Sequence, residues 1–278
     1  FANTGYVEKP PIMDNVIYYD GTVASDPINE SFISSEAGVN FSSDNFAVKV
    51  SAYNTDWKDR NLTKAVTTGQ GDSGDTDVIF LKGIGQKHQG LEVEGSMKLN
   101  DMVRLDGAVS FGKWKFDGDA DGLYTEYAED APKQTAYTYT LDGLYVGDQP
   151  QTAYVLGTTL TPMDGLRLQG IFKMYDKNYA DWSPDSRELS GDADRSQVWQ
   201  APGYNRLDLH ASYKLPKIAG YDMTLTGHLF NALDAVYVQD AVDNSQYNGF
   251  GDKLHLAHNA EVFLGTPRYF NLGLTVNF

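Results

Sequence analysis

The sequence contains no cysteine. That absence excludes a disulfide scaffold, a thiolate metal site and a cysteine nucleophile. Long apolar runs are also missing. No segment approaches the ~18 residues of a membrane-spanning helix, and the mean hydropathy is −0.43. Neither feature excludes a transmembrane β-barrel, because only every second residue of a barrel strand faces lipid.

Basic residues are scarce as well. Lys and Arg total 22 against 38 Asp and Glu, which gives a net charge of −16. This balance makes nucleic acid an unlikely partner, and an anionic membrane surface too. The sequence has no Gly-x-Ser-x-Gly, no His-Glu-x-x-His and no phosphate loop, so we expect no enzymatic activity and no required cofactor. It starts at Phe1 with no methionine and no signal peptide, and we interpret it as a processed or partial chain.

The sequence is rich in tyrosine and glycine, with 18 and 27 copies, and in segments that alternate between apolar and polar residues. In the closing stretch "RYFNLGLTVNF", Phe270, Leu272, Leu274, Val276 and Phe278 share one parity. Strict alternation predicts strands with one apolar and one polar face. Nine such strands are predicted, at 32–41, 46–53, 91–99, 103–111, 152–160, 166–175, 206–215, 223–230 and 268–278.

The connections between these strands alternate in length. Short ones of a few residues take turns with long ones at about 58–87, 116–149, 181–202 and 231–265, and residues 1–30 are predicted to be a further outer loop. This alternation is typical of an up-and-down barrel, in which short turns gather at one end and long loops at the other. Nine strands after a loop give an odd number, whereas bacterial barrels have even numbers, so we expect further strands before residue 1.

Several stretches then resemble the TonB-dependent receptors of Gram-negative outer membranes. Residues 30–60 resemble the family's Glu-x-Gly strand (here Glu36 and Gly38), its turn and its next strand ending in Trp-Lys-Asp. "GLEVEG" (90–95) resembles the strand that follows. "HLFNALDAVY" (228–237) and "GTPRYFNLGLTVNF" (265–278) resemble the family's late Asn-Leu-Phe-Asp-x-x-Tyr stretch and its closing strand. "VGDQPQTAY" (146–154) and "DKNYADW" (176–182) resemble large-looped importers of bulky nutrients.

The resemblance implies an all-β fold: about nine C-terminal strands of a transmembrane antiparallel barrel of 22 strands with a plug in its lumen. The plug and the N-terminal strands are not present in residues 1–278. The implied function is TonB-dependent import of a glycan, peptide or chelate through the outer membrane, with the long loops outside. The implied partners are outer-membrane lipids, the barrel-assembly machinery, TonB through the missing N-terminal region, and a surface lipoprotein. Phe270 and Phe278 would form the assembly signal.

Two other classes of protein stay open at this point. One is a passive porin or adhesin barrel, which would lack a plug upstream. The other is a secreted β-sandwich that binds glycans, in which solvent rather than a lumen would hydrate the polar strand faces. Solubility without detergent would favour the sandwich.

Aromatic residues of the long loops are the candidates for ligand contact, because rings bury a large area at little cost in entropy. We predict this role for Trp182, Trp199 and Tyr247. Tyr175, Tyr179 and Tyr204 lie near strand ends, where we interpret them as girdle residues at the membrane interface.

The stretch "DGDADG" carries the candidate metal ligands Asp117, Asp119 and Asp121, which match the first half of a calcium loop. The match is partial, because Ala128 stands where the loop's final glutamate is expected. His255 and His258 are three residues apart and could ligate one metal only if the segment made a helical turn. We interpret both histidines as solvated loop residues.

Overall fold

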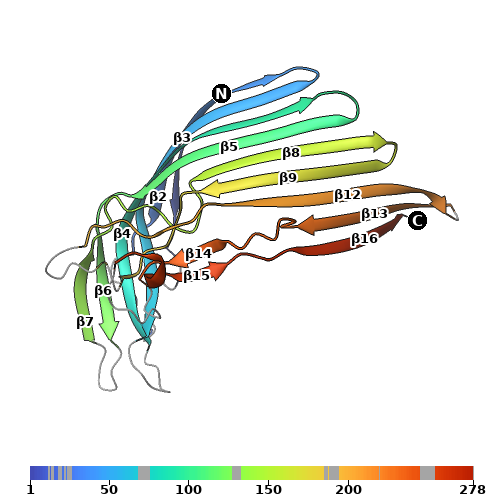
Figure 1. The fold of residues 1–278 in the computed structure, drawn as a ribbon. Coiled ribbons are helices and arrows are strands. Elements are labelled where there is room, and N and C mark those ends of the chain that lie inside the picture. Colours follow the sequence, from blue (N-terminus) through green and yellow to red (C-terminus); the bar gives the residue numbers. More distant parts are fainter. Residues whose placement is uncertain are drawn as a thin grey trace.

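A computed structural model describes residues 1–11, 13, 16–17, 21, 23, 27–67, 76–126, 133–184, 187, 194–218, 220–244 and 254–277. Its main feature is one curved antiparallel sheet, visible across Figure 1. Ten strands follow each other in the order β1-β2-β3-β4-β5-β8-β9-β12-β13-β16, and two more, β6 and β7, extend from β4. Within the described residues β1 and β16 do not pair, so the sheet is an open segment of a barrel wall.

The strands of the wall have the following bounds: β1 Ala2–Lys9, β2 Glu30–Ser42, β3 Phe46–Thr67, β4 Thr76–Lys98, β5 Val103–Phe116, β8 Thr152–Met163, β9 Leu166–Asp176, β12 Tyr204–Ile218, β13 Tyr221–Phe230 and β16 Tyr269–Asn277. The remaining elements belong to the long connections: β6 Ala120–Glu126, β7 Lys133–Tyr139, β10 Asn178–Tyr179, β11 Gln200–Ala201, β14 Val238–Val242, η3 Ala257–Asn259 and β15 Glu261–Leu264.

The alternation in sequence becomes two faces of the sheet. Leu272 and Phe270 on the apolar face of β16 are 74% and 72% exposed, and Val39 of β2 is equally bare. The opposite face is polar and hollowed by a cleft of about 710 Å³, to which Glu94, Asp106 and other polar residues contribute. An apolar face left bare over neighbouring strands is suited to lipid. No helix in the described ranges is long and apolar enough to cross a membrane, a finding that does not bear on β-barrels.

The two ends of the sheet differ as the sequence predicts. The hairpins β2–β3, β4–β5, β8–β9 and β12–β13 turn within a few residues at one end, while β6, β7, β14 and β15 crowd the other end (Figure 1). The long connections contain more strand than the prediction gave them, most of all in two regions. The region 58–87 is mostly strand, because β3 and β4 stay paired as far as Thr67 opposite Thr76. The region 116–149 contains the hairpin of β6 and β7.

The prediction of a loop over residues 1–30 is wrong for residues 2–9, which form β1 and pair with β2 from Ala2 opposite Ala37 to Lys9 opposite Glu30. Among the described residues the wall therefore has ten strands, which is an even number. No apolar parity marks "ANTGYVEK", and all eight residues are exposed. Backbone hydrogen bonds to the neighbouring strand form this element, and a hydrophobic pattern cannot reveal such a strand.

The hydrophobic core lies at the loop end of the sheet. A single layer has no second layer to pack against along the wall, so side chains bury each other only where the long connections fold over the strand ends. The core contains residues from the first part of β4, from the end of β5 and from the connections that follow β5 and β9. Its buried members are Ile79, Leu81, Ile84, Phe116, Ala120, Tyr139, Leu141, Leu144, Tyr179, Trp182 and Val198.

Candidate functional site

A buried asparagine shapes the turn after β13. Asn231 has no exposed surface, and its φ of 48° lies in the left-handed region, which asparagine tolerates better than most residues. Its side-chain oxygen accepts a hydrogen bond from the amide of Ala235 (3.0 Å). Its side-chain amide donates to the carbonyls of Ala235 (2.9 Å) and Thr266 (3.2 Å). Asn231 thus ties the start of the β13–β16 connection to its end.

Asp208 of β12 anchors the same turn to the wall. Its carboxylate accepts hydrogen bonds from the backbone amide of Asn231 (2.9 Å) and from Nζ of Lys173 (2.9 Å). Nη2 of Arg206 lies 3.6 Å from the same carboxylate. Asp208 is only 2% exposed, and these cations and the amide offset the cost of removing its charge from water. The contacts also fix the direction of Arg206.

Three tyrosine rings line up beside this arginine. Tyr204 and Tyr237 stack with centroids 4.3 Å apart and planes at 19°, and Tyr175 lies 5.1 Å from Tyr204. Nη1 of Arg206 donates to the hydroxyl of Tyr237 at 2.9 Å. The backbone at Gly265 also lies close to this ring, because a side chain there would clash with it. A hydrogen bond and a close backbone contact therefore hold the ring of Tyr237.

These rings border a cleft of about 510 Å³ at the loop end of the wall, which we call the tyrosine cleft. Tyr204, Arg206 and Asp208 alternate along β12, so the cleft opens on the polar face of the sheet. Ring faces, a guanidinium and amide and carboxylate groups together suit a polar ligand with flat apolar surfaces. Its lining residues are Asp148, Gln149, Pro150, Tyr175, Tyr204, Arg206, Tyr237, Gln239 and Asp240.

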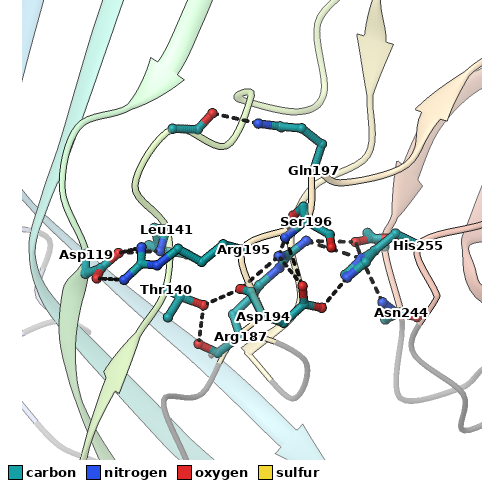
Figure 2. Close-up of polar contacts among 12 residues, drawn as sticks. Asp119, Thr140, Leu141, Arg187, Asp194, Arg195, Ser196, Gln197, Asn244 and His255 are labelled. Carbon is teal, nitrogen blue, oxygen red and sulfur yellow. Dashed lines mark hydrogen bonds and ion pairs between the residues drawn. The ribbon is translucent and has the colours of Figure 1, made fainter. Parts of the chain in front are cut away.

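A charged cluster joins two long connections next to the core (Figure 2). Nδ1 of His255 lies 2.5 Å from Asp243 Oδ2, and Nε2 lies 2.5 Å from Asp194 Oδ2. A carboxylate at each ring nitrogen favours a proton on each and hence the imidazolium form, although Asn244 Nδ2 (2.9 Å) and Arg187 Nη2 (3.2 Å) also face Nδ1. Arg187, whose side chain is 0% exposed, adds a second cation 3.5 Å from Asp243. We call Arg187, Asp194, Asp243 and His255 the inter-loop cluster.

The pKa values of the inter-loop cluster reflect this pairing. Burial by itself lowers the pKa of His255, but the hydrogen bonds to Asp243 and Asp194 outweigh it and raise the pKa above its ordinary value. For Asp194 burial has the opposite effect and raises the pKa. Its hydrogen bonds, led by the one from His255, outweigh burial and hold the pKa of Asp194 below its usual range. Ion pairs therefore stabilise the inter-loop cluster, so the stability of the cluster depends on pH.

A second contact fixes the β9–β12 connection to the region after β5. Arg195 makes a two-pronged pair with Asp119, with Nη1 and Nη2 at 2.9 and 2.7 Å from the two carboxylate oxygens. The same carboxylate accepts the amide of Leu141 at 3.1 Å, and Gln197 donates to the carbonyl of Gly143 at 2.8 Å. Figure 2 shows these contacts beside the inter-loop cluster. Three connections are thus joined into one layer above the wall.

The comparisons with known proteins agree with this architecture. The sequence matches the family described as TonB dependent receptor-like, beta-barrel, over residues 1–232. The chain belongs to this family. The resemblance in sequence is thereby confirmed, together with the β-barrel fold, and the family is one of transport receptors of the Gram-negative outer membrane. The polar face of the sheet is accordingly the lumen side of a TonB-dependent receptor barrel.

Solved structures show the same fold. The structure named "Copper transporter OprC" has a TM-score of 0.60 and 14% identity over 98% of this chain and 36% of that chain. The structure titled "Structure of the FpvAI-pyocin S2 complex" has a TM-score of 0.54 and 14% identity over 99% of this chain and 31% of that one. The chain thus spans about a third of the length of each. No curated protein matches the sequence.

Of the predicted ligand contacts, Trp182 is placed inside the loop core. It is 2% exposed and packs edge-to-face against Phe116 (centroids 6.3 Å apart) and at 6.1 Å from Tyr139. In this position it offers a ligand almost no surface, and its role is to hold the connections together. Trp199 is partly exposed, and ligand contact by it stays a prediction. Tyr247 lies outside the described residues.

The predicted girdle residues need correction. Tyr175 and Tyr204 border the tyrosine cleft on the lumen face, and a girdle residue must face lipid. Tyr179 is buried in the loop core and stacks on Tyr145 with centroids 4.2 Å apart. The sequence did contain a signal that Tyr204 faces the lumen, because it has the same parity as Arg206. The signal was missed because the strand was predicted to start at residue 206, whereas β12 starts at Tyr204. Tyr237 ends the stretch "HLFNALDAVY", but nothing local could reveal its stacking partner, because Tyr204 lies 33 residues away.

Two of the three predicted metal ligands use their carboxylates in other contacts, and the third is placed by its backbone. Asp119 is paired with Arg195, and Asp121 stands in strand β6, where it accepts a hydrogen bond from the hydroxyl of Thr138 (3.2 Å). Asp117 precedes the strand, and its amide pairs with Gly85 of β4. Across the part of the chain that the structure describes, no group of three His, Cys, Asp or Glu could hold a metal ion. Calcium elsewhere in the outer loops stays a prediction.

Two further predictions concern histidines and the chain end. His255 is buried in the inter-loop cluster and is not a solvated residue. His258 lies in η3, the only helical turn between β14 and β15 in the described residues. Phe270 lies on the lipid-facing side of β16, where an assembly signal would be accessible, and that role stays a prediction. Phe278 lies outside the described residues.

Proposed function

We propose that the chain is the C-terminal part of an outer-membrane receptor that imports a nutrient with energy supplied through TonB. The observation that carries the proposal is the tyrosine cleft, which opens on the lumen face of a wall belonging to this family. Its volume is in the range of small-molecule sites. A solute entering between the long connections would meet this part of the wall first.

For the ligand we propose an oligosaccharide without strong negative charge. Sugar rings stack on tyrosine faces, and the arginine, amide and carboxylate groups of the cleft supply both donors and acceptors for hydroxyl groups. The net charge of −16 and the carboxylates of Asp148 and Asp240 oppose a highly anionic cargo. A peptide or a chelate is the alternative cargo, and the experiment below separates the three.

The proposed surroundings follow from the two faces and the two ends of the wall. Outer-membrane lipids cover the apolar face, and the long connections face outside, where a surface lipoprotein could cover them. TonB acts on the N-terminal region of the full receptor. The barrel-assembly machinery reads the last strand, including Phe270 and Phe278. Neither nucleic acid binding nor enzymatic activity is part of this function.

The test is uptake of fluorescently labelled cello-oligosaccharides by cells that carry the full-length receptor. We expect accumulation that a protonophore abolishes, because TonB draws on the inner-membrane proton gradient. Arg206→Ala should reduce uptake at least tenfold. Leu209→Ala, on the exposed lipid side of the same strand, is the matched control and should behave as the wild type.

The other outcomes are equally definite. Uptake that persists with the protonophore would identify a passive pore and overturn the import mechanism. Uptake of a fluorescently labelled tryptic casein digest or of radiolabelled ferric citrate, without uptake of the sugar, would replace the proposed ligand by a peptide or a chelate. A full-length product that stays soluble without detergent would refute the membrane barrel.

A further inference from the structure

Two histidines meet on the lumen face in the middle of the wall. His210 of β12 and His228 of β13 are directly opposite each other in the antiparallel register. Their Nδ1 atoms are 2.8 Å apart, and their ring centroids are 5.0 Å apart. His210 lies six residues from Tyr204 along the strand, which is roughly 20 Å at strand spacing. The pair is therefore separate from the tyrosine cleft and independent of the proposed function.

The spacing of the two nitrogens restricts what can lie between them. In a neutral pair the Nδ1–H of one ring donates to the Nδ1 of the other, and a metal bound at both nitrogens would shift that proton to Nε2 of its own ring. A metal that replaces the proton would need bonds of about 2.0–2.1 Å to each nitrogen. Two such bonds at a right angle separate the nitrogens by about 2.9 Å, and a tetrahedral angle separates them by about 3.3 Å. The observed 2.8 Å corresponds to the right angle.

We propose that His210 and His228 form a two-histidine site for a divalent transition metal, and that Cu²⁺ or Ni²⁺ is preferred. These ions favour imidazole ligands in square-planar or tetragonal arrangements, in which neighbouring ligands stand at right angles. Zn²⁺, which prefers tetrahedral sites, would require the strands to move the rings apart by several tenths of an ångström.

The surroundings suit such a site and limit its strength. The rings border a lumen-side cleft of about 480 Å³ that also contains Gln169, Asn271 and Arg167. Amide oxygens and water can occupy the remaining positions, since no third His, Cys, Asp or Glu joins the pair in the described residues. The guanidinium of Arg167 opposes a cation. We therefore expect weaker binding than at a site with three or four protein ligands.

The test uses the full-length receptor in detergent. Calorimetric titration with Cu²⁺ and Ni²⁺ measures the affinity, and electron paramagnetic resonance of the Cu²⁺ form shows how many nitrogens coordinate the ion. We expect one site whose spectrum shows coupling to two nitrogens. H210N and H228N should each weaken it at least tenfold and remove the two-nitrogen pattern. H88N is the matched control, because His88 is a part-buried strand histidine stacked on Trp114, and it should bind as the wild type. Heat-modifiable migration on gels confirms that each variant is folded.

A measurement on the wild type alone guards against misfolded variants. Diethylpyrocarbonate modifies free imidazoles, and mass spectrometry locates the products. Saturating Cu²⁺ should protect His210 and His228 and leave the reactivity of His88 unchanged. Equal modification with and without Cu²⁺ would overturn the proposal. So would a folded double variant, H210N with H228N, that retains the affinity and spectrum of the wild type.

Discussion

Asn231 allows a quantitative test of how the tyrosine cleft is held. Asn231→Ala removes three side-chain hydrogen bonds, two to Ala235 and one to Thr266. At about 1 kcal/mol each, their loss destabilises the turn by about 3 kcal/mol. The φ of 48° adds about 1 kcal/mol, because alanine is strained in the left-handed region. We expect the β13–β16 connection to lose about 4 kcal/mol of local stability.

The assay is hydrogen exchange with mass spectrometry on the full-length receptor in detergent. Peptides over 232–242 and 261–268 report the connection, and a peptide over 166–176 in β9 is the internal reference. A loss of about 4 kcal/mol corresponds to nearly a thousandfold faster exchange, or to complete loss of protection where the wild-type connection is less stable than that.

Two control variants separate the contributions in this experiment. Asn231→Gly loses the same bonds but accepts the backbone angle, so it should exchange more slowly than the alanine variant. Asn100→Ala removes an exposed turn asparagine, whose side chain accepts the amide of Met102, and should change exchange little. Less than a tenfold increase in Asn231→Ala, with protection still remaining in these peptides, would refute the view that this side chain holds the cleft.

Three further predictions address the cleft, the loops and the membrane face. Gly265→Ala should displace Tyr237 and weaken binding of a cello-oligosaccharide at least tenfold by calorimetry, whereas Gly5→Ala, which has open space around it, should not. The raised pKa of His255 means that its stabilisation is complete below about pH 6.5 and is lost as pH rises through the higher folded value. Limited trypsin digestion of the 181–202 connection should therefore accelerate above neutral pH, and a flat profile would contradict the imidazolium. Leu272→Arg should cost about 2–4 kcal/mol in lipid and reduce the heat-modifiable folded fraction. Asn271→Arg on the lumen face should assemble normally, and equal defects would reverse the two faces.

The strands of the barrel wall could be predicted from the sequence, because the alternation of apolar and polar residues that marks them is local. The face of each strand residue follows from its parity, so alternation around Leu272 or His210 predicts lipid and lumen sides without knowledge of the neighbouring strand. The alternation of short and long connections predicts which strand ends meet. The motif around Asn231 was recognised as a resemblance, and the structure supplies its reason: the asparagine ties the two ends of one connection together.

The contents of the long connections were not accessible in this way. His255 bonds to Asp194, 61 residues away, and no pattern near either residue marks the contact. Trp182 has the composition of a ligand-binding residue, yet it fills the core that the connections bury. Strand β1 has no apolar parity and forms because β2 presents an unpaired edge.

The sequence by itself determined the two faces and the two ends of the wall, because strand geometry converts residue order directly into direction. Only the tertiary structure decided which loop residues meet, because contacts between segments far apart in the chain depend on where the whole wall carries them. The tyrosine cleft combines both kinds of information. Parity points Tyr204 and Arg206 toward the lumen, and the turn at Asn231 brings Tyr237 beside them.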